Sequence, residues 1–257
     1  MMRSYPLSAA KMTIAATALL LALSIGPAIG AAGAKGVRGI DVSRFQGHIA
    51  WQQVGQTQIK FAFVQASRGS GADCLVVPEE CGADPYYERN YAAAREEGIR
   101  VGAYHRAFAS GPGPEAARAD AREEANVFIA SVGGLRGEDL LPVLDVETPF
   151  TDLDEASLRV WIRAWMNRVE RKLGSKGIIY TNYSSWSATG DTTSFALDGH
   201  PLWVANFDVP EPLVPADDWA GNGWSVWQYT SSGHVRGITG NVDRNRLFGG
   251  FGPISVG

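Results

Sequence analysis

The sequence predicts an α/β protein, a single flattened TIM-like barrel of about five βα units followed by about three strands. Short β-branched and aromatic runs alternate with longer segments of helical period, a pattern typical of parallel strands joined by crossover helices. Several of the strand runs are almost continuously apolar, as in strands that are covered on both faces. The segment from Val37 to Phe251 also fits the lower end of the size range of eight-stranded barrels.

Eight segments have the composition of strands, seven of them clear and the last weaker: residues 37–42, 61–66, 100–105, 142–147, 177–181, 202–205, 225–229 and 238–243. No long helical pattern separates the last of these segments. We therefore expect about five βα units and then about three strands without long helices between them.

Three helices are expected between the strands. The first begins at Asp84 and Pro85, interpreted as N-cap and first helical residue, and ends before Gly98. The second runs from Pro114 to Gly133. The third ends at Gly174 and carries an apolar stripe at helical spacing, which predicts a face buried against the core: Leu158, Trp161, Ile162, Trp165, Val169 and Leu173.

Residues 1–34 are expected to be a signal peptide that is removed, which leaves the barrel domain at residues 35–257. Arg3 and Lys11 precede an apolar run from Ile14 to Ile25, which a Gly-Pro pair and a tract of small residues follow. The run is shorter than the ~20 residues that a membrane span needs. We expect a secreted protein, extracellular or periplasmic, with no stable membrane association after cleavage.

The charge balance argues against anionic partners. The chain has 23 basic and 27 acidic residues, a formal charge of −4, and removal of Arg3 and Lys11 makes it −6. An acidic domain is poorly suited to binding nucleic acid, and we expect none as a partner. Oligomerisation leaves no signal in the sequence, and we expect a monomer.

No cofactor or metal is expected. The four histidines lie at spacings that form no metal-ligand set: His48, His105, His200 and His234. His105 ends a strand and is interpreted as a hydrogen-bonded structural histidine, with a place in the cleft as the alternative. The sequence has no P-loop, dinucleotide fingerprint or nucleophile elbow.

Two cysteines, Cys74 and Cys81, are expected to form a disulfide that closes a short surface loop. Their spacing is not that of a zinc site, and exported proteins commonly form disulfides. Chain entropy gives such a small loop a stabilisation of about 2.5 kcal/mol.

Four acidic residues end strand runs or follow them: Asp41, Asp145, Glu147 and Asp243. The active sites of such barrels lie at the carboxyl ends of the strands. Each of two of these acids also has a structural explanation when it is considered alone: Asp41 as the cap of a loop, and Asp243 as the partner of Arg244 in an ion pair. Four acids on segments that a barrel brings together are more informative than any one of them.

The segment Leu141-Pro142-Val143-Leu144-Asp145-Val146-Glu147 carries the main chemical hypothesis. Two carboxyl groups at i and i+2 of a strand point to the same face. Burial and a like-charged neighbour each favour the protonated form of one of them. A protonated carboxylic acid beside an ionised one is what glycoside cleavage needs. The alternative is two solvated carboxylates at a strand end.

Aromatic and amide side chains cluster at the same strand ends. Sugar rings have apolar faces that rest on aromatic side chains, with polar groups placed around them. Core packing is the alternative for each aromatic residue. The candidate substrate-binding residues are Tyr104, Tyr180, Asn182, Trp203, Asn206, Trp227 and Gln228.

Seven motifs occur in an order that resembles the family 25 glycoside hydrolases, the lysozymes also called N,O-diacetylmuramidases. They are Gly-Ile-Asp-Val-Ser at 39–43, Phe-Ala-Phe-Val-Gln-Ala-Ser at 61–67, Gly-Ala-Tyr-His at 102–105, Asp-Val-Glu at 145–147, Ile-Tyr-Thr at 179–181, Leu-Trp-Val-Ala at 202–205 and Trp-Gln-Tyr at 227–229. The resemblance covers nearly all of the expected mature chain.

The resemblance implies a flattened β/α barrel and cleavage of the β-1,4 bond between N-acetylmuramic acid and N-acetylglucosamine of bacterial peptidoglycan. By matching position, Glu147 is implied as the general acid, and Asp145, Asp41 and Asp243 match the family's other acidic positions. One departure stands out. Arg68, in Gln-Ala-Ser-Arg-Gly at 65–69, replaces an acid that many members carry. This replacement leaves the substrate preference at the rim of the cleft open.

Three alternatives remain open at this stage. The first is a chitinase-like glycosidase with a similar Asp-x-Glu strand. The second is a catalytically inactive glycan-binding barrel, against which the presence of Glu147 argues. The third is an adhesive surface protein, which offers no reason for acids and aromatic residues at the strand ends.

Overall fold

The structure, a computed structural model, describes residues 36–70 and 81–257, which belong to one compact unit. The expected signal peptide and Cys74 of the expected disulfide lie outside the described residues, so both stay predictions. None of the helices in these two ranges is long and apolar enough to cross a membrane.

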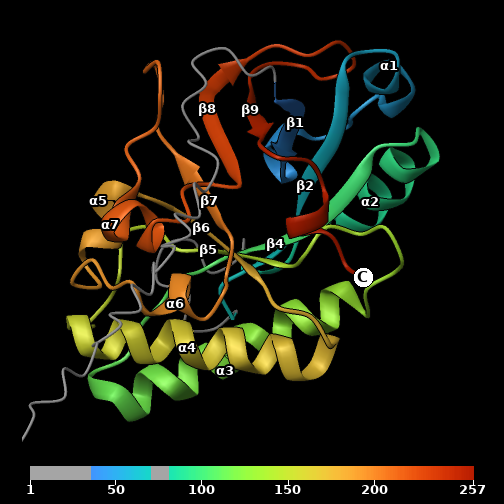
Figure 1. Cartoon of the computed structure of the whole chain (residues 1–257). Coiled ribbons are helices and arrows are strands. Elements are labelled where there is room, and N and C mark those ends of the chain that lie inside the picture. Colours follow the sequence, from blue (N-terminus) through green and yellow to red (C-terminus); the bar gives the residue numbers. More distant parts are fainter. Residues whose placement is uncertain (1–35, 71–80) are drawn as a thin grey trace, which may run out of the picture. The chain divides into compact units, whose positions relative to one another are not determined.

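Eight strands close into a barrel, which confirms the predicted fold class (Figure 1). The neighbours run in the order β1-β9-β8-β7-β6-β5-β4-β2, and β2 pairs back onto β1. The strands are β1 (Val37–Val42), β2 (Ile59–Arg68), β4 (Arg100–Arg106), β5 (Val143–Asp145), β6 (Ile178–Asn182), β7 (Leu202–Ala205), β8 (Val226–Gly233) and β9 (Val242–Leu247). The short β3 (Gly82–Ala83) pairs with the end of β2.

All barrel neighbours are parallel except β9, which runs antiparallel to both β8 and β1. No helix joins β8 to β9, and a chain that returns without a crossover can only pair antiparallel. The expectation of an eighth strand is right, but its bounds are wrong, because the strand starts at Val242 rather than at Ile238. The bounds of the strand predicted at 142–147 also differ: β5 ends at Asp145, so Glu147 lies beyond the strand.

The three expected helices are α2 (Tyr87–Glu96), α3 (Gly113–Val132) and α4 (Glu155–Leu173). Gly133 and Gly174 end α3 and α4 in the left-handed conformation, with φ of 71° and 74°. Asp84 does not cap α2, whose N-cap residue is Tyr86. The carboxylate of Asp84 instead accepts hydrogen bonds from the backbone N–H groups of Tyr86 and Arg44.

Short helices that the sequence pattern did not reveal complete the connections: α1 (Trp51–Gly55), α5 (Tyr183–Ser187), α6 (Ser194–Leu197), α7 (Pro215–Ala220) and the 3-10 turns η1 (Arg44–Gln46) and η3 (Gly252–Ile254). In α7 the residues from Ala216 to Ala220 have φ between 51° and 56°, so this turn is left-handed. Its buried Trp219 donates a hydrogen bond to the backbone oxygen of His200, which ties the turn to the loop before β7.

The barrel interior forms its own apolar cluster, distinct from the larger one between strands and helices. Phe61 and Phe63 of β2 fill it, and two glycines on neighbouring strands make room for their rings. A Cβ at Gly39 would lie 2.3 Å from the ring of Phe61, and one at Gly102 would lie 2.6 Å from that of Phe63. The apolar filling leaves the other end of the barrel to polar side chains.

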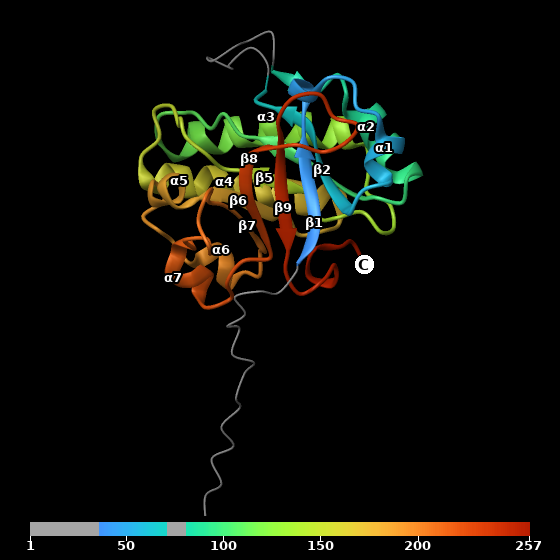
Figure 2. The same cartoon turned by 90° about the horizontal axis from the view of Figure 1, so that it is seen from above.

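Helices α3 and α4 lie side by side along one flank of the barrel, as Figures 1 and 2 both show. The predicted apolar stripe of α4 is buried, and Trp161, Ile162 and Trp165 have no exposed surface. Burial of this stripe leaves the opposite, charged faces of the two helices toward solvent.

Candidate active site

Strand register brings the candidate residues to one level of the barrel. Arg106, Asp145, Tyr180 and Trp203 are successive partners across β4, β5, β6 and β7. Asp41 of β1 lies opposite Asp243 of β9 in the same way. Residues paired in register point to the same face of a sheet, so these side chains converge inside the barrel mouth.

A cavity of about 210 Å³ opens at this level. All four predicted acids line it, and so do Tyr104, Tyr180, Trp203 and Gln228 among the predicted substrate-binding residues. The other lining residues are Val42, Ser43, Phe45, Gln46, Gln65, Arg68 and Arg106. The structure therefore gathers carboxyl groups, aromatic rings and amides in one cleft, as the sequence led us to expect.

Asp41 is held by a buried hydrogen-bond network. Its two oxygens accept from Gln228 Nε2 at 3.2 and 3.0 Å, and Oδ2 also accepts from Asn245 Nδ2 at 2.7 Å. Tyr180 Oη donates to Gln228 at 2.9 Å, and Trp203 Nε1 donates to Asn245 at 2.9 Å. Both amides are thereby oriented with their N–H groups toward Asp41.

Asp41 and Asp243 divide one proton between them. Burial raises the pKa of Asp41 to about 6, although hydrogen bonds from Gln228, Asn245 and Asp243 favour its charged form. Burial, then the negative charge of Asp41 and the hydrogen bond to it, raise the pKa of Asp243 to about 9. At neutral pH Asp243 is thus the protonated donor and Asp41 the charged acceptor.

Asp145 and Glu147 form a second coupled pair. Burial and the charge of Glu147 raise the pKa of Asp145 well above its usual range, while Arg106 opposes the shift. Arg106 Nε lies 3.6 Å from Asp145 Oδ2 and 3.9 Å from Glu147 Oε1. The Asp145 side chain is 9% exposed and that of Glu147 is 30% exposed, so Glu147 is the member of the pair that a substrate can reach.

The comparisons with known proteins agree with this geometry. The sequence profile of glycosyl hydrolases family 25 matches residues 40–238. The chain belongs to glycosyl hydrolases family 25. It is 34% identical to Lysozyme M1 of Streptomyces globisporus over 88% of this chain and 74% of that protein. It is 28% identical to the N,O-diacetylmuramidase of Chalaropsis sp over 80% of this chain and 96% of that protein.

A solved structure shares the fold as well. The bacterial lysozyme from Streptomyces coelicolor superposes with a TM-score of 0.71 at 32% identity, covering 84% of this chain and 94% of that one. A family 25 hydrolase from Bacillus anthracis, at 24% identity and a TM-score of 0.67, supports the fold alone. The predicted family is confirmed, and the chain is a glycoside hydrolase.

Three predicted substrate-binding residues do not line the cavity of this family 25 hydrolase. Asn182 Oδ1 caps α5 by accepting from Ser185 N at 2.8 Å. Asn206 Oδ1 accepts from Leu213 N at 2.8 Å, and its backbone oxygen accepts from Trp227 Nε1 at 2.8 Å. Trp227 packs in the cluster outside the barrel, because it alternates with inward-facing Gln228. A direct role for these three in substrate binding stays a prediction.

Sequence reasoning missed several side chains at the site. Gln65, Arg106 and Asn245 each lie two residues from a recognised or inward-facing position on their strands, so a period of two could have revealed them. Phe45 is 70% exposed at the rim, and no strand pattern marks it. It adds an exposed aromatic surface at the edge of the cavity.

Arg68, the residue that departs from the family pattern, lines the cavity. Its guanidinium lies 5.0 Å from the ring centroid of Phe108 and 5.8 Å from that of Phe45. Cation–π contacts of this length hold the guanidinium against the rim. The structure thus gives Arg68 a position beside the substrate entrance.

His105 is a structural histidine, as expected, with no exposed surface. Its Nδ1 is 2.8 Å from Ser67 Oγ and its Nε2 is 2.7 Å from Glu124 Oε2. Burial and then the charge of Arg106 lower the pKa of His105 to about 3, so the ring is neutral. Glu124 also accepts from the backbone N–H of Phe108 at 3.2 Å, which fixes the chain directly after Arg106.

Among residues 36–70 and 81–257, no group of three or more His, Cys, Asp or Glu side chains is arranged to hold a metal ion.

Replacing Asp243 by asparagine is expected to raise the unfolding temperature at pH 8 and to leave it unchanged at pH 4. The native state keeps on Asp243 a proton that the unfolded chain releases above about pH 4, because its folded pKa is raised to about 9. The wild type therefore loses stability as the pH rises through this window, and asparagine does not titrate. We expect a gain of about 3 °C, or ~1 kcal/mol, by scanning calorimetry at pH 8.

An equal change in unfolding temperature at both pH values would contradict this prediction, because it would point to altered packing rather than to the proton. Asp208→Asn is the matched control, since Asp208 is exposed and lies outside the cavity.

Proposed function

We propose that this chain is a lysozyme that hydrolyses the β-1,4 bond between N-acetylmuramic acid and N-acetylglucosamine in bacterial peptidoglycan. The observation that carries the proposal is the coupled pair of Asp145 and Glu147 in an aromatic-lined cavity of a family 25 hydrolase. A lysozyme and an N,O-diacetylmuramidase among the relatives support this substrate.

Glu147 acts as the general acid in this proposal. Its carboxyl group donates a proton to the glycosidic oxygen while the bond from that oxygen to the anomeric carbon breaks. The partial exposure of Glu147 allows contact with the substrate, and the pKa of its buried neighbour Asp145 is raised by burial and by the charge of Glu147. Arg106 stabilises the negative charge that the pair holds after the transfer.

The substrate's own acetamido group is the proposed nucleophile. Asp145 and Glu147 both lie beside Arg106 Nε, at 3.6 and 3.9 Å, so they approach a sugar ring from one side and not from the opposite faces that two-carboxylate mechanisms require. The acetamido oxygen instead bonds to the anomeric carbon, and charged Asp41, with Asp243, stabilises the positive charge that develops. Glu147 then deprotonates a water molecule, which bonds to the anomeric carbon and displaces the acetamido oxygen. The product therefore keeps the configuration of the substrate.

The test combines substrate choice and stereochemistry. We expect new reducing ends from purified cell walls and far fewer from chitin oligomers, with the β-anomer appearing first by proton NMR. Equal rates on chitin would favour the chitinase-like alternative. An initial α-anomer would overturn the retaining scheme while leaving the lysozyme assignment intact. Binding to walls without any reducing ends would favour the inactive glycan-binding barrel.

The setting of this activity is also part of the proposal. A cell-wall substrate is consistent with an extracellular or periplasmic protein that loses residues 1–34 on export. The proposed Cys74–Cys81 disulfide suits that oxidising setting. The proposed active form is a monomer without stable membrane association.

A further inference from the structure

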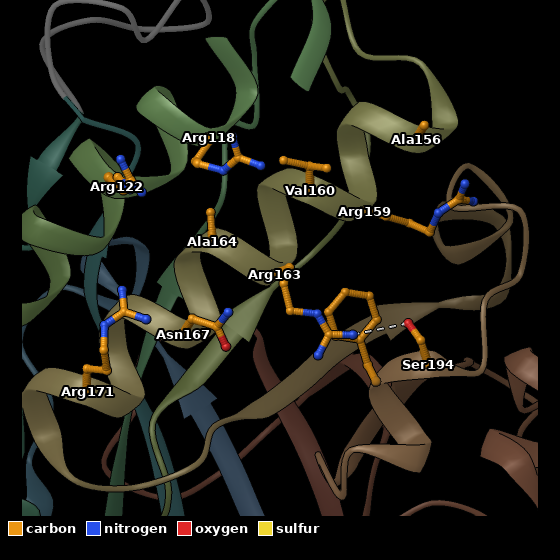
Figure 3. A pocket seen from close by; sticks show the side chains of 11 residues that line it. Arg118, Arg122, Ala156, Arg159, Val160, Arg163, Ala164, Asn167, Arg171 and Ser194 are labelled. Carbon is orange, nitrogen blue, oxygen red and sulfur yellow. Dashed lines mark hydrogen bonds between the residues drawn. The ribbon is translucent and has the colours of Figure 1, made fainter. Parts of the chain in front are cut away.

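A second hollow lies between α3, α4 and α6 and shares no lining residue with the active-site cavity. Its volume is about 430 Å³. None of the described residues that line it is acidic, and five are arginines: Arg118, Arg122, Arg159, Arg163 and Arg171. Figure 3 shows the arginines of the two helices around one hollow, which we call the arginine groove.

The arginines of the groove follow a regular spacing. On α4, Arg159, Arg163, Asn167 and Arg171 are each four residues apart, and Arg118 and Arg122 of α3 have the same interval (Figure 3). Four residues of an α-helix rise about 6 Å, so the α4 row extends over about 18 Å. A row of this kind matches a chain with repeated anionic groups better than a single small anion.

Acidic neighbours neutralise only part of this charge. Arg159 pairs with Glu155, and Arg163 pairs with Asp198. In the described part of the chain, exposed Arg118, Arg122 and Arg171 make no hydrogen bond or ion pair. Like charges four residues apart on a helix repel each other and destabilise it.

We propose that the arginine groove binds the phosphodiester-linked anionic polymers of bacterial cell walls, at a site separate from the active site. Guanidinium groups match phosphate oxygens with two parallel hydrogen bonds each. The choice of wall polymer rests on the proposed function, because a lysozyme works where such polymers are attached. Binding there holds the enzyme on its insoluble substrate between cleavage events.

The lining favours this ligand over two other polyanions. Single-stranded nucleic acids need aromatic side chains on which bases stack. Phe195, the aromatic residue in the lining, is 1% exposed and lies under the Arg163 guanidinium at 4.2 Å. Membrane surfaces call for projecting apolar side chains. Val160 and Ala164 are half-buried within the groove instead.

The test compares two triple variants of the full mature chain. The groove variant carries Arg118→Gln, Arg122→Gln and Arg171→Gln. The control carries Arg38→Gln, Lys60→Gln and Arg236→Gln, which remove the same charge from exposed positions outside the groove. Binding of soluble poly(glycerol phosphate) is measured by titration calorimetry at several salt concentrations.

We expect the groove variant to bind about tenfold more weakly than the wild type, from three exposed charge pairs. The slope of log K against log salt should become shallower by about 2. The control should lose much less affinity.

Three results would overturn the proposal. One is equal binding by wild type and groove variant. Another is an equal loss in the control, which would assign the effect to net charge. The third is groove-dependent binding of phosphatidylglycerol vesicles or single-stranded DNA without binding of poly(glycerol phosphate). Hydrolysis of polymer-free glycan should be the same in all three proteins. If none hydrolyses it, the proposed function fails while the binding result still decides the groove.

Discussion

Replacing Glu147 by glutamine is expected to reduce the rate of cell-wall hydrolysis at least ~100-fold, because the variant keeps the side chain's shape and loses its proton. Glu147 is the more exposed member of the coupled pair, and its Oε1 lies 3.9 Å from Arg106 Nε. The measurement is the appearance of reducing ends, together with loss of turbidity of a purified wall suspension. The unfolding temperature should change little, because the side chain is not fully buried.

Glu211→Gln is the matched control for this variant, since Glu211 is exposed and lies outside the cavity. It should hydrolyse walls like the wild type. Glu147→Gln should still pellet with walls, because the aromatic lining and the arginine groove are unchanged. Near-normal hydrolysis by Glu147→Gln at an unchanged unfolding temperature would remove Glu147 from the role of general acid.

Replacing Asp145 by asparagine is expected to reduce hydrolysis by about 100-fold at pH 7, because asparagine cannot hold or release a proton beside Glu147. Burial and the charge of Glu147 raise the pKa of Asp145 well above its usual range. Asparagine does not titrate, so the limb of the pH–rate profile that belongs to Asp145 should be absent from the variant.

The full pH–rate profile distinguishes this effect from simple disruption of the site. The limb that reports the titration of Asp145 should be missing in Asp145→Asn, whereas Asp208→Asn should leave the profile unchanged. A uniform loss at every pH, with the shape of the wild-type profile, would contradict a titrating role and would assign Asp145 to substrate orientation.

Strand periodicity was sufficient for most of the fold. The runs at 37–42 and 202–205 became β1 and β7 without change, and Gly133 and Gly174 end the helices that they were expected to end. The predicted bounds of the last strand, 238–243, were wrong because this strand carries residues of the site. Its inward positions carry Asp243 and Asn245, polar residues of the site, so the apolar signal that marks a strand is absent there.

The residues of the candidate site also fall into two groups, those that the sequence revealed and those that only the tertiary structure revealed. The sequence alone determined the Asp145–Glu147 pair, the two further acids and the family, because these depend on residue types in short motifs. Tertiary structure decided which other side chains join them. Barrel closure sets register, and register placed Arg106 beside Asp145 and turned Trp227 outward.

The arginine groove, which two helices form together, could not be predicted from the sequence either. Each helix shows its arginines in the sequence, but neither reveals that they face one hollow. Packing of α3 against α4 brings together residues about forty positions apart, and chain order contains no direct record of that contact. Local pattern determines which faces are buried, whereas long-range packing determines which exposed faces become neighbours.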